Sequence, residues 1–296
     1  MRGRGPEAPA EAVAGWLIAR AERLDIQSIR TVYSVYSEKS HVRFIDAHVH
    51  LGTSRTTGYV VTEAAIEQTL AQYDIDCMLV MPQPRDECVE ETNERIAALQ
   101  RGRPGSVFGI VNIDPRLPDR VYERIARGCI DEYGFVAIKV HTSGFSVSPD
   151  DAICEKIYAI AKETGVAVMV HTGLGGSVAD PRRVEAPARA FPDVNFVFCH
   201  AGFGPYHEQA LTIARACPNV TLEPSWCPTF AVRAMLDAVG ADRIMFGSDH
   251  LDNVPVELAK FAALKLEPAQ RAAIFAETAR RVFRLEARSR VGGEHP

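Results

Sequence analysis

The chain has 296 residues, enough for one large barrel or two ordinary domains, and 47% of its residues are apolar, so it can bury a substantial core. Its formal charge of -5 at pH 7 gives no basic field for a nucleic-acid backbone or an anionic lipid surface, which argues against both partners. No apolar run approaches the ~20 residues of a membrane span, and we expect a small-molecule substrate.

The seven cysteines are scattered singly, and their number is odd. The chain has no Cys-x-x-Cys pair, which argues against a disulfide framework and against a zinc ribbon. The N-terminal segment is a poor signal peptide because its apolar stretch is short and is followed by alternating charges. These features predict a cytoplasmic protein.

The first forty residues are predicted to form an extension of the main domain. Residues 1–10 are rich in Gly, Pro and Ala and are expected to be disordered, whereas residues 10–30 carry a helical pattern of apolar side chains. We therefore expect an extension over residues 1–40, a barrel over residues 41–288 and a flexible tail over residues 289–296.

From residue 42 onward, short apolar runs alternate with amphipathic stretches, which is typical of βα units around a parallel sheet. The runs are rich in Val, Ile, Phe, Met and Leu, as expected for strands buried on both faces. The eight runs are 42–49, 77–81, 107–113, 135–140, 166–170, 194–199, 220–222 and 243–246. They predict an α/β fold closed into a (β/α)₈ TIM barrel. An open doubly wound sheet would normally carry a Gly-rich phosphate loop after its first strand, where this chain has HVHLGTSRTTG.

Ionisable side chains fall at the ends of several of these runs. His48 and His50 come at the end of the first run, and His171 follows the fifth. His200 follows the sixth run, and Asp249 comes shortly after the eighth. Because the carboxyl ends of all barrel strands converge on one mouth, we expect these five side chains to meet there.

The spacing of His48 and His50 suits a shared metal ion. Residues two apart on a strand point to the same side, so both imidazoles can bind one ion. A single histidine at a strand end is more often a hydrogen-bonded packing residue, but five suitable residues at four of eight strands favour a metal site. Neutral imidazoles with a carboxylate suit Zn²⁺ and also admit Mn²⁺ or Fe²⁺. We expect one divalent ion, with zinc as the first choice.

Several longer motifs carry a resemblance to a known family. They are FIDAHVHLG, AIKVHTSGF, GVAVMVHTG, FPDVNFVFCHAGFG, NVTLEPS, RIMFGSDH and ETARRVFRL. In this order, over roughly residues 42–286, the chain resembles the amidohydrolase superfamily, in the branch that includes aminocarboxymuconate semialdehyde decarboxylase. The resemblance implies that His48, His50, His171 and Asp249 hold the metal, and that His200 works beside it as a base or an electrophile. It also implies a parallel barrel and a homodimer.

The role of Lys139 is open at this stage. In binuclear members of the superfamily, a lysine at the end of the fourth strand is carboxylated and bridges two metals, with His171 and His200 at the equivalent positions binding the second ion. In the branch that this chain resembles, one metal is the usual state. We therefore expect a single ion, with Lys139 pairing with a carboxylate in the barrel or binding an anionic substrate.

The resemblance covers both hydrolases and decarboxylases. In a hydrolase, the metal would activate water to cleave a C–N or C–O bond of an amide, lactone, ester or imide. Asp249 would accept the proton of the water, and His200 would polarise the substrate oxygen or shuttle a proton. In a decarboxylase, the same residues would bind an unsaturated or aromatic acid and protonate the carbon left behind. Decarboxylases of the branch tend to have longer loops, and this barrel is compact. We therefore expect a metal-dependent hydrolase, with decarboxylation as the alternative.

Other residues are candidates for the substrate pocket. Lys139 and His141 lie at the end of the fourth run and just after it, and Trp226 follows the seventh. All three are expected to bind substrate, although Trp226 could equally cap the barrel as an apolar plug. Glu223 has two possible roles, an interaction with metal-bound water or a pair with Lys139. Cys199 lies beside the predicted site, but no motif marks it as a nucleophile. A non-catalytic barrel would be expected to have lost some of the five site residues, and all are present.

Overall fold

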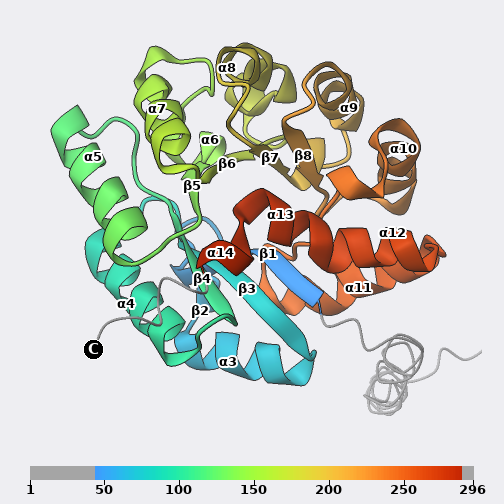
Figure 1. Cartoon of the computed structure of the whole chain (residues 1–296), viewed down its shortest axis with the longest axis horizontal. Helices are drawn as coiled ribbons and strands as arrows, with labels where there is room; N and C mark the ends of the chain where they lie inside the picture. The colour runs from blue at the N-terminus through green and yellow to red at the C-terminus, as the bar shows by residue number, and fades with distance from the viewer. Residues whose placement is uncertain (1–43, 289–296) are drawn as a thin grey trace, which may run out of the picture. The chain divides into compact units, whose positions relative to one another are not determined.

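The computed structural model of the protein describes residues 44–288, in which helices surround a curled sheet of eight strands (Figure 1). The predicted N-terminal extension, its helix and the C-terminal tail lie outside the described residues. The strands are β1 (Phe44–Thr53), β2 (Val60–Val61), β3 (Ile75–Pro82), β4 (Val107–Val111), β5 (Ala137–Val140), β6 (Ala167–His171), β7 (Phe196–Cys199) and β8 (Val220–Glu223).

Helices follow most of the strands, and none of those described is long and apolar enough to cross a membrane. The α-helices are α3 (Glu63–Gln72), α4 (Val89–Gly102), α5 (Asp119–Arg127), α6 (Thr142–Phe145), α7 (Glu155–Thr164), α8 (Glu185–Ala190), α9 (His207–Ala216), α10 (Thr229–Val239), α11 (Val254–Ala263), α12 (Pro268–Ala272), α13 (Thr278–Phe283) and α14 (Leu285–Arg288). The shorter helical turns are η1 (Gly128–Glu132), η2 (Ala152–Cys154), η3 (Gly176–Ala179), η4 (Pro181–Val184), η5 (His200–Gly202), η6 (Ala241–Arg243), η7 (Leu251–Asn253) and η8 (Ala273–Glu277).

The sheet order is β2-β1-β3-β4-β5-β6-β7-β8. From β1 onward in this order, each strand pairs in parallel with the next. Seven of the eight predicted runs are therefore strands, with ends that differ by a few residues. The two-residue β2 was not predicted, and it pairs antiparallel with the end of β1. The parallel strands are almost completely buried, as their continuous apolar sequences require.

The eighth predicted run is not a regular strand, but it closes the barrel. Ile244 pairs in parallel with Leu222 of β8, and Asp249 pairs in parallel with Val49 of β1. The Asp249 N–H also donates to the His48 carbonyl at 2.7 Å. The segment from Ile244 to Asp249, called the closing segment below, thus joins the two ends of the sheet, and the predicted TIM barrel is confirmed.

One end of the barrel is filled by the last helices. Ile45 of β1, Phe108 of β4 and Val197 of β7, all in the first halves of their strands, share a buried cluster with Val282 and Phe283 of α13. Figure 1 shows α13 and α14, in red, crossing the centre of the ring of strands. The strand beginnings are therefore covered, and the strand ends form the mouth.

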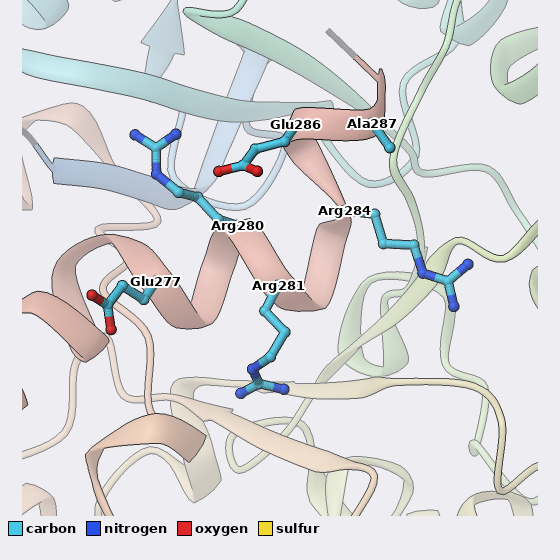
Figure 2. Close-up of a pocket in the computed structure, with 6 residues that line it drawn as sticks. All are labelled: Glu277, Arg280, Arg281, Arg284, Glu286 and Ala287. Atoms are coloured by element: carbon cyan, nitrogen blue, oxygen red, sulfur yellow. The ribbon is translucent and has the colours of Figure 1, made fainter. Parts of the chain in front are cut away.

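The C-terminal helices also border a hollow of about 540 Å³ at the covered end. Figure 2 shows that the guanidinium groups of Arg280, Arg281 and Arg284 spread away from one another around it. Arg280 pairs with Asp76 at 3.2 Å, and Arg281 donates to the carbonyl of Asp242. Because these three charges diverge, and Arg280 and Arg281 turn towards local partners, the hollow lacks the convergent polar groups of a ligand site. Arg280 and Arg281 attach α13 to the barrel.

Close packing of the barrel wall depends on a glycine in β4. A Cβ added at Gly109 would lie 2.2 Å from the ring of Phe135. The Phe135 ring is itself completely buried, so it has little room to move away.

We therefore expect Gly109→Ala to lower the free energy of unfolding by about 1–3 kcal/mol, the usual cost of overpacking a core. The matched control is Gly102→Ala at the end of α4, where a Cβ meets nothing within 4 Å. That change should leave stability unchanged or slightly raised. Urea denaturation of both variants measures the difference, and equal unfolding midpoints would contradict the packing argument.

Candidate metal centre and active site

The five residues predicted to meet do lie at the barrel mouth. His48 and His50 are in β1, His171 is the last residue of β6, His200 directly follows β7, and Asp249 ends the closing segment. The ring centroid of His48 lies 5.2 Å from that of His50 and 5.1 Å from that of His200. The rings of His171 and His200 are 4.9 Å apart. The four histidines are buried, and the Asp249 side chain is 15% exposed.

Three of the candidate ligands form a tight group. The Nε2 atoms of His48 and His50 are 3.3 Å apart, and each lies 3.4 Å from Oδ1 of Asp249. Tetrahedral ligands at the usual zinc distances of about 2.0–2.1 Å are separated by roughly 3.3–3.4 Å. The spacing of these atoms therefore fits ligands of a single divalent ion.

The outer nitrogens of the same two histidines fix their tautomers. His48 Nδ1 lies 2.8 Å from a carboxylate oxygen of Glu223, and His50 Nδ1 lies 3.2 Å from the carbonyl of Pro82. Both oxygens are acceptors, so each Nδ1 carries the hydrogen and each Nε2 presents a lone pair. Two lone pairs and the carboxylate of Asp249 thus face one point, where a positive charge is needed. Metal ligands are oriented in this way in proteins, and the residues fit a divalent ion.

His171 presents a bare nitrogen of a different kind. Its Nε2 donates to the carbonyl of Leu174 at 2.6 Å, while its Nδ1 is buried without a hydrogen-bond partner. An orphaned buried acceptor is costly unless something binds it. The ligand atoms of His171 are nevertheless outside the tight group formed by the other three predicted ligands. His171 as the fourth ligand therefore stays a prediction.

Asp249 is oriented by Trp226. The indole N–H of Trp226 donates to Oδ2 of Asp249 at 2.8 Å, which leaves Oδ1 facing the histidines. Trp226, Asp249 and His200 all have φ values between 63° and 67°, a conformation that non-glycine residues adopt at a cost. Such strain tends to cluster where function requires it. Trp226 was predicted to bind substrate or to plug the barrel, and its 40% exposure keeps it accessible at the mouth.

Lys139 places a cationic side chain inside the barrel. It is completely buried, and its Nζ lies 3.1 Å from His48 Nε2 and 2.8 Å from Cys199 Sγ. It forms no ion pair with a carboxylate among residues 44–288, so that predicted role is wrong. Lys139 instead lies beside the three converging acceptors.

His141 differs from the other site histidines. Its Nδ1 accepts a hydrogen bond from the Gly144 N–H at 3.1 Å, so the neutral ring carries its hydrogen on Nε2. The ring stacks on that of His171 at 4.8 Å and lies 5.8 Å from that of His50. A Cβ at Gly144 would come within 2.8 Å of His141 Nδ1, so a glycine is needed for this close approach. His141 is thus arranged as a hydrogen-bond donor.

His200 is arranged as an acceptor. Its Nδ1 lies 2.8 Å from the hydroxyl of Ser225, and that hydroxyl donates to Glu223 at 3.1 Å. A serine hydroxyl has one hydrogen, so it must accept from His200 Nδ1–H, and Nε2 is left bare. Of the two predicted roles for His200, this arrangement suits a base better than an electrophile.

Burial sets the protonation of the site. It lowers the pKa values of His48, His141 and His200 well below the usual range, and burial together with the charge of Lys139 lowers the pKa of His171 to about 4. Burial opposes ionisation of Asp249, but the neighbouring histidine rings hold its pKa well below the usual range. At neutral pH the site therefore offers neutral imidazoles and a carboxylate, the forms that bind divalent ions.

Two of the important residues were missed or misjudged from the sequence. Glu223 was expected to contact metal-bound water or to pair with Lys139; it bonds His48 and not Lys139, and the contact with metal-bound water stays a prediction. Its place at the end of a buried strand was a signal, because a fully buried glutamate is rare without a specific partner. Ser225 gave no signal, since its role depends on how the following loop turns back.

The barrel and its mouth define a metal-dependent enzyme of the (β/α)₈ class. A family model described as amidohydrolase matches residues 45–285, and the chain belongs to this family. The chain matches no curated protein.

Solved structures show the same fold. One is 2,6-dihydroxybenzoate decarboxylase in complex with 2,6-dihydroxybenzoate, with a TM-score of 0.67, 17% identity and coverage of 82% of this chain and 99% of that chain. A second is dihydroxybenzoic acid decarboxylase from Polaromonas sp. JS666 with bound manganese and 2-nitroresorcinol, with a TM-score of 0.62, 16% identity and coverage of 82% and 97%. A third is an amidohydrolase from Burkholderia multivorans with bound zinc, with a TM-score of 0.62, 18% identity and coverage of 82% and 99%.

The arrangement of the acceptors predicts that metal binding stabilises the folded protein. Adding Zn²⁺ or Mn²⁺ to chelator-treated protein should raise Tm by several degrees, because a ligand at 100 times its Kd contributes about 2.7 kcal/mol. The double variant His48→Ala, His50→Ala should lose this shift. His207→Ala at the start of α9 is the control and should keep it. An unchanged Tm in the parent protein would contradict the metal site. A metal analysis that finds two bound equivalents per chain would support a carboxylated Lys139.

Proposed function

We propose that this protein is a decarboxylase that removes the carboxylate of a small aromatic or unsaturated acid with the help of one divalent metal ion. The observation that carries the proposal is the convergence of His48 Nε2, His50 Nε2 and Asp249 Oδ1 within 3.4 Å, next to a histidine held as a base. The names of two similar structures, both decarboxylases of dihydroxybenzoates, support this reaction over the hydrolysis expected from the compact sequence.

The site can hold an anionic substrate. A divalent ion, when bound, supplies positive charge that binds and polarises the carboxylate of the acid. The Nε2–H of His141 can donate to a second substrate oxygen, and the buried Lys139 adds a cationic side chain near the same point. These are two of the three substrate-binding residues expected from the sequence, and Trp226 is the third.

The base is suited to proton transfer at carbon. Loss of CO₂ breaks one C–C bond and leaves its electron pair on the ring carbon, which then takes a proton. His200 Nε2 can accept a proton from an acidic hydroxyl of the substrate and return it to this carbon. Ser225 and Glu223 stabilise the doubly protonated ring in between, because both lie on the Nδ1 side of the imidazole.

Aromatic side chains at the mouth favour a planar substrate. Trp226 is stacked with Phe203 at 6.2 Å and meets His250 edge-on at 5.7 Å. His250 in turn stacks on Tyr59 at 4.7 Å, with the two planes 2° apart. Flat, partly exposed rings of this kind bind other flat rings by stacking. Trp226 therefore remains our candidate for the entrance of the substrate pocket.

Hydrolysis is the second candidate. The family description and the similar zinc-bound amidohydrolase support it, since the same ion and the same base could activate water. Zinc and manganese are both candidates for the ion, and the homodimer expected from the resemblance is a further prediction, which light scattering would test.

The deciding assay uses protein loaded with Mn²⁺ or Zn²⁺ and a panel of hydroxylated benzoic acids and unsaturated acids, with amides, esters and lactones beside them. We expect CO₂ release matched by the decarboxylated product. His200→Asn should lower kcat by about 10²–10⁴-fold, the usual contribution of a general base, with the metal content unchanged. His207→Asn is the control. Cleavage of the esters, lactones or amides without CO₂ release would replace the proposal with hydrolysis.

A further inference from the structure

We propose that Glu223 is a positioning residue that holds both the metal ligand His48 and the base His200 in their working tautomers through a single carboxylate. For His200 the inference rests on the proposed function. For His48 it rests only on metal binding and is independent of the reaction catalysed.

The carboxylate of Glu223 is completely buried and surrounded by donors. Its Oε2 accepts from His48 Nδ1–H at 2.8 Å, from the Ser225 hydroxyl at 3.1 Å and from the backbone N–H of His200 at 3.4 Å. Its Oε1 accepts from the Ser225 N–H at 2.6 Å. A buried carboxylate with this many donors is fixed in place, and each bond constrains the group that donates it.

The space for this carboxylate is provided by a glycine of the closing segment. A Cβ at Gly247 would lie 2.7 Å from Cδ of Glu223 and 2.8 Å from its Oε1. The carboxylate is therefore packed directly against the Gly247 backbone, two residues before Asp249. Glu223 is thus surrounded by residues of β1, of the chain just after β8 and of the closing segment, which also carries Asp249.

The first effect of Glu223 is on His48. Because the carboxylate accepts, it requires a hydrogen on Nδ1 and leaves the Nε2 lone pair directed at His50 and Asp249. The opposite tautomer would put an N–H where the metal ligand must be. Removing outer partners of this kind typically lowers metal affinity or activity by about 10–100-fold.

The second effect reaches His200 through Ser225. While Glu223 takes the hydroxyl hydrogen of Ser225, the serine oxygen can only accept from His200 Nδ1–H, and His200 Nε2 stays free to take a proton. Without that acceptor, the hydroxyl could turn its hydrogen towards Nδ1. The ring hydrogen would then move to Nε2 and block the base.

Glu223→Gln in the full chain tests both effects. Glutamine keeps the shape of the glutamate side chain, but the backbone N–H groups of Ser225 and His200 donate to different oxygens of the Glu223 carboxylate. The amide NH₂ therefore meets a donor in either orientation. We expect the affinity for Zn²⁺ and Mn²⁺, measured by competition with a chromophoric chelator, to fall about 10–100-fold. Thr221→Val on the same strand is the buried control and should keep the parent affinity.

Ser225→Ala separates the two effects. It should keep the metal affinity, because His48 retains its carboxylate partner, while kcat falls roughly tenfold with little change in KM. Ser225→Thr restores the hydroxyl and should restore kcat. A purely structural role for Ser225 would not give this split or this rescue.

Nitrogen NMR of metal-free protein labelled with ¹⁵N-histidine reports the tautomers directly. We expect hydrogen on Nδ1 of His48 in the parent protein, and a shift towards Nε2 in Glu223→Gln. Hydrogen on Nε2 of His48 in the parent would overturn the proposal even if the glutamine variant did not fold. Parent metal affinity in a folded Glu223→Gln would also overturn it, and unchanged kcat in Ser225→Ala would overturn its His200 part. If no acid releases CO₂, the proposed reaction fails, while the affinity and tautomer measurements still test His48.

Discussion

The hydrogen bond from the Asp249 N–H to the His48 carbonyl, 2.7 Å long, is where the barrel closes, and the metal centre depends on it. It places a carboxylate from the end of the domain beside the histidines of its first strand. Asp46 supports the same seam, because it accepts from the N–H and the hydroxyl of Ser248, 202 positions along the chain. Burial raises the pKa of Asp46 to about 7, so the seam includes a costly buried group whose hydrogen bonds offset part of that cost.

Closure also explains which parts of the site could be predicted. The alternation of apolar runs identified the strands, and barrel topology alone brings His48, His50, His200 and Asp249 to one mouth. The eighth run was harder to define, because the backbone beyond it departs from a strand, with Asp249 at a φ of 67°. The prediction that this run closes the barrel was correct, but the run forms isolated bridges and not the predicted regular strand.

The parts that failed depend on loop geometry and on hydrogen positions. Glu223 bonds His48 and packs against the backbone of Gly247, and no local pattern encodes such contacts between distant parts of the chain. The position of Ser225 relative to His200 depends likewise on the turn after β8. The choice between hydrolysis and decarboxylation is not settled by the sequence, because loop length, on which the expectation of hydrolysis rested, says little about the groups that face the substrate.

The two flanking histidines give the site a direction. His141 carries its hydrogen on the free nitrogen because Gly144 donates to the other one, whereas His200 has a bare nitrogen because Ser225 accepts. One side of the centre therefore presents a hydrogen-bond donor and the other presents an acceptor. Since neither ring is free to exchange its tautomer without breaking a buried hydrogen bond, this polarity is built into the fold. The acid substrate proposed above would therefore bind with its anionic oxygens towards His141 and its reacting carbon towards His200, which would restrict both its orientation and its shape.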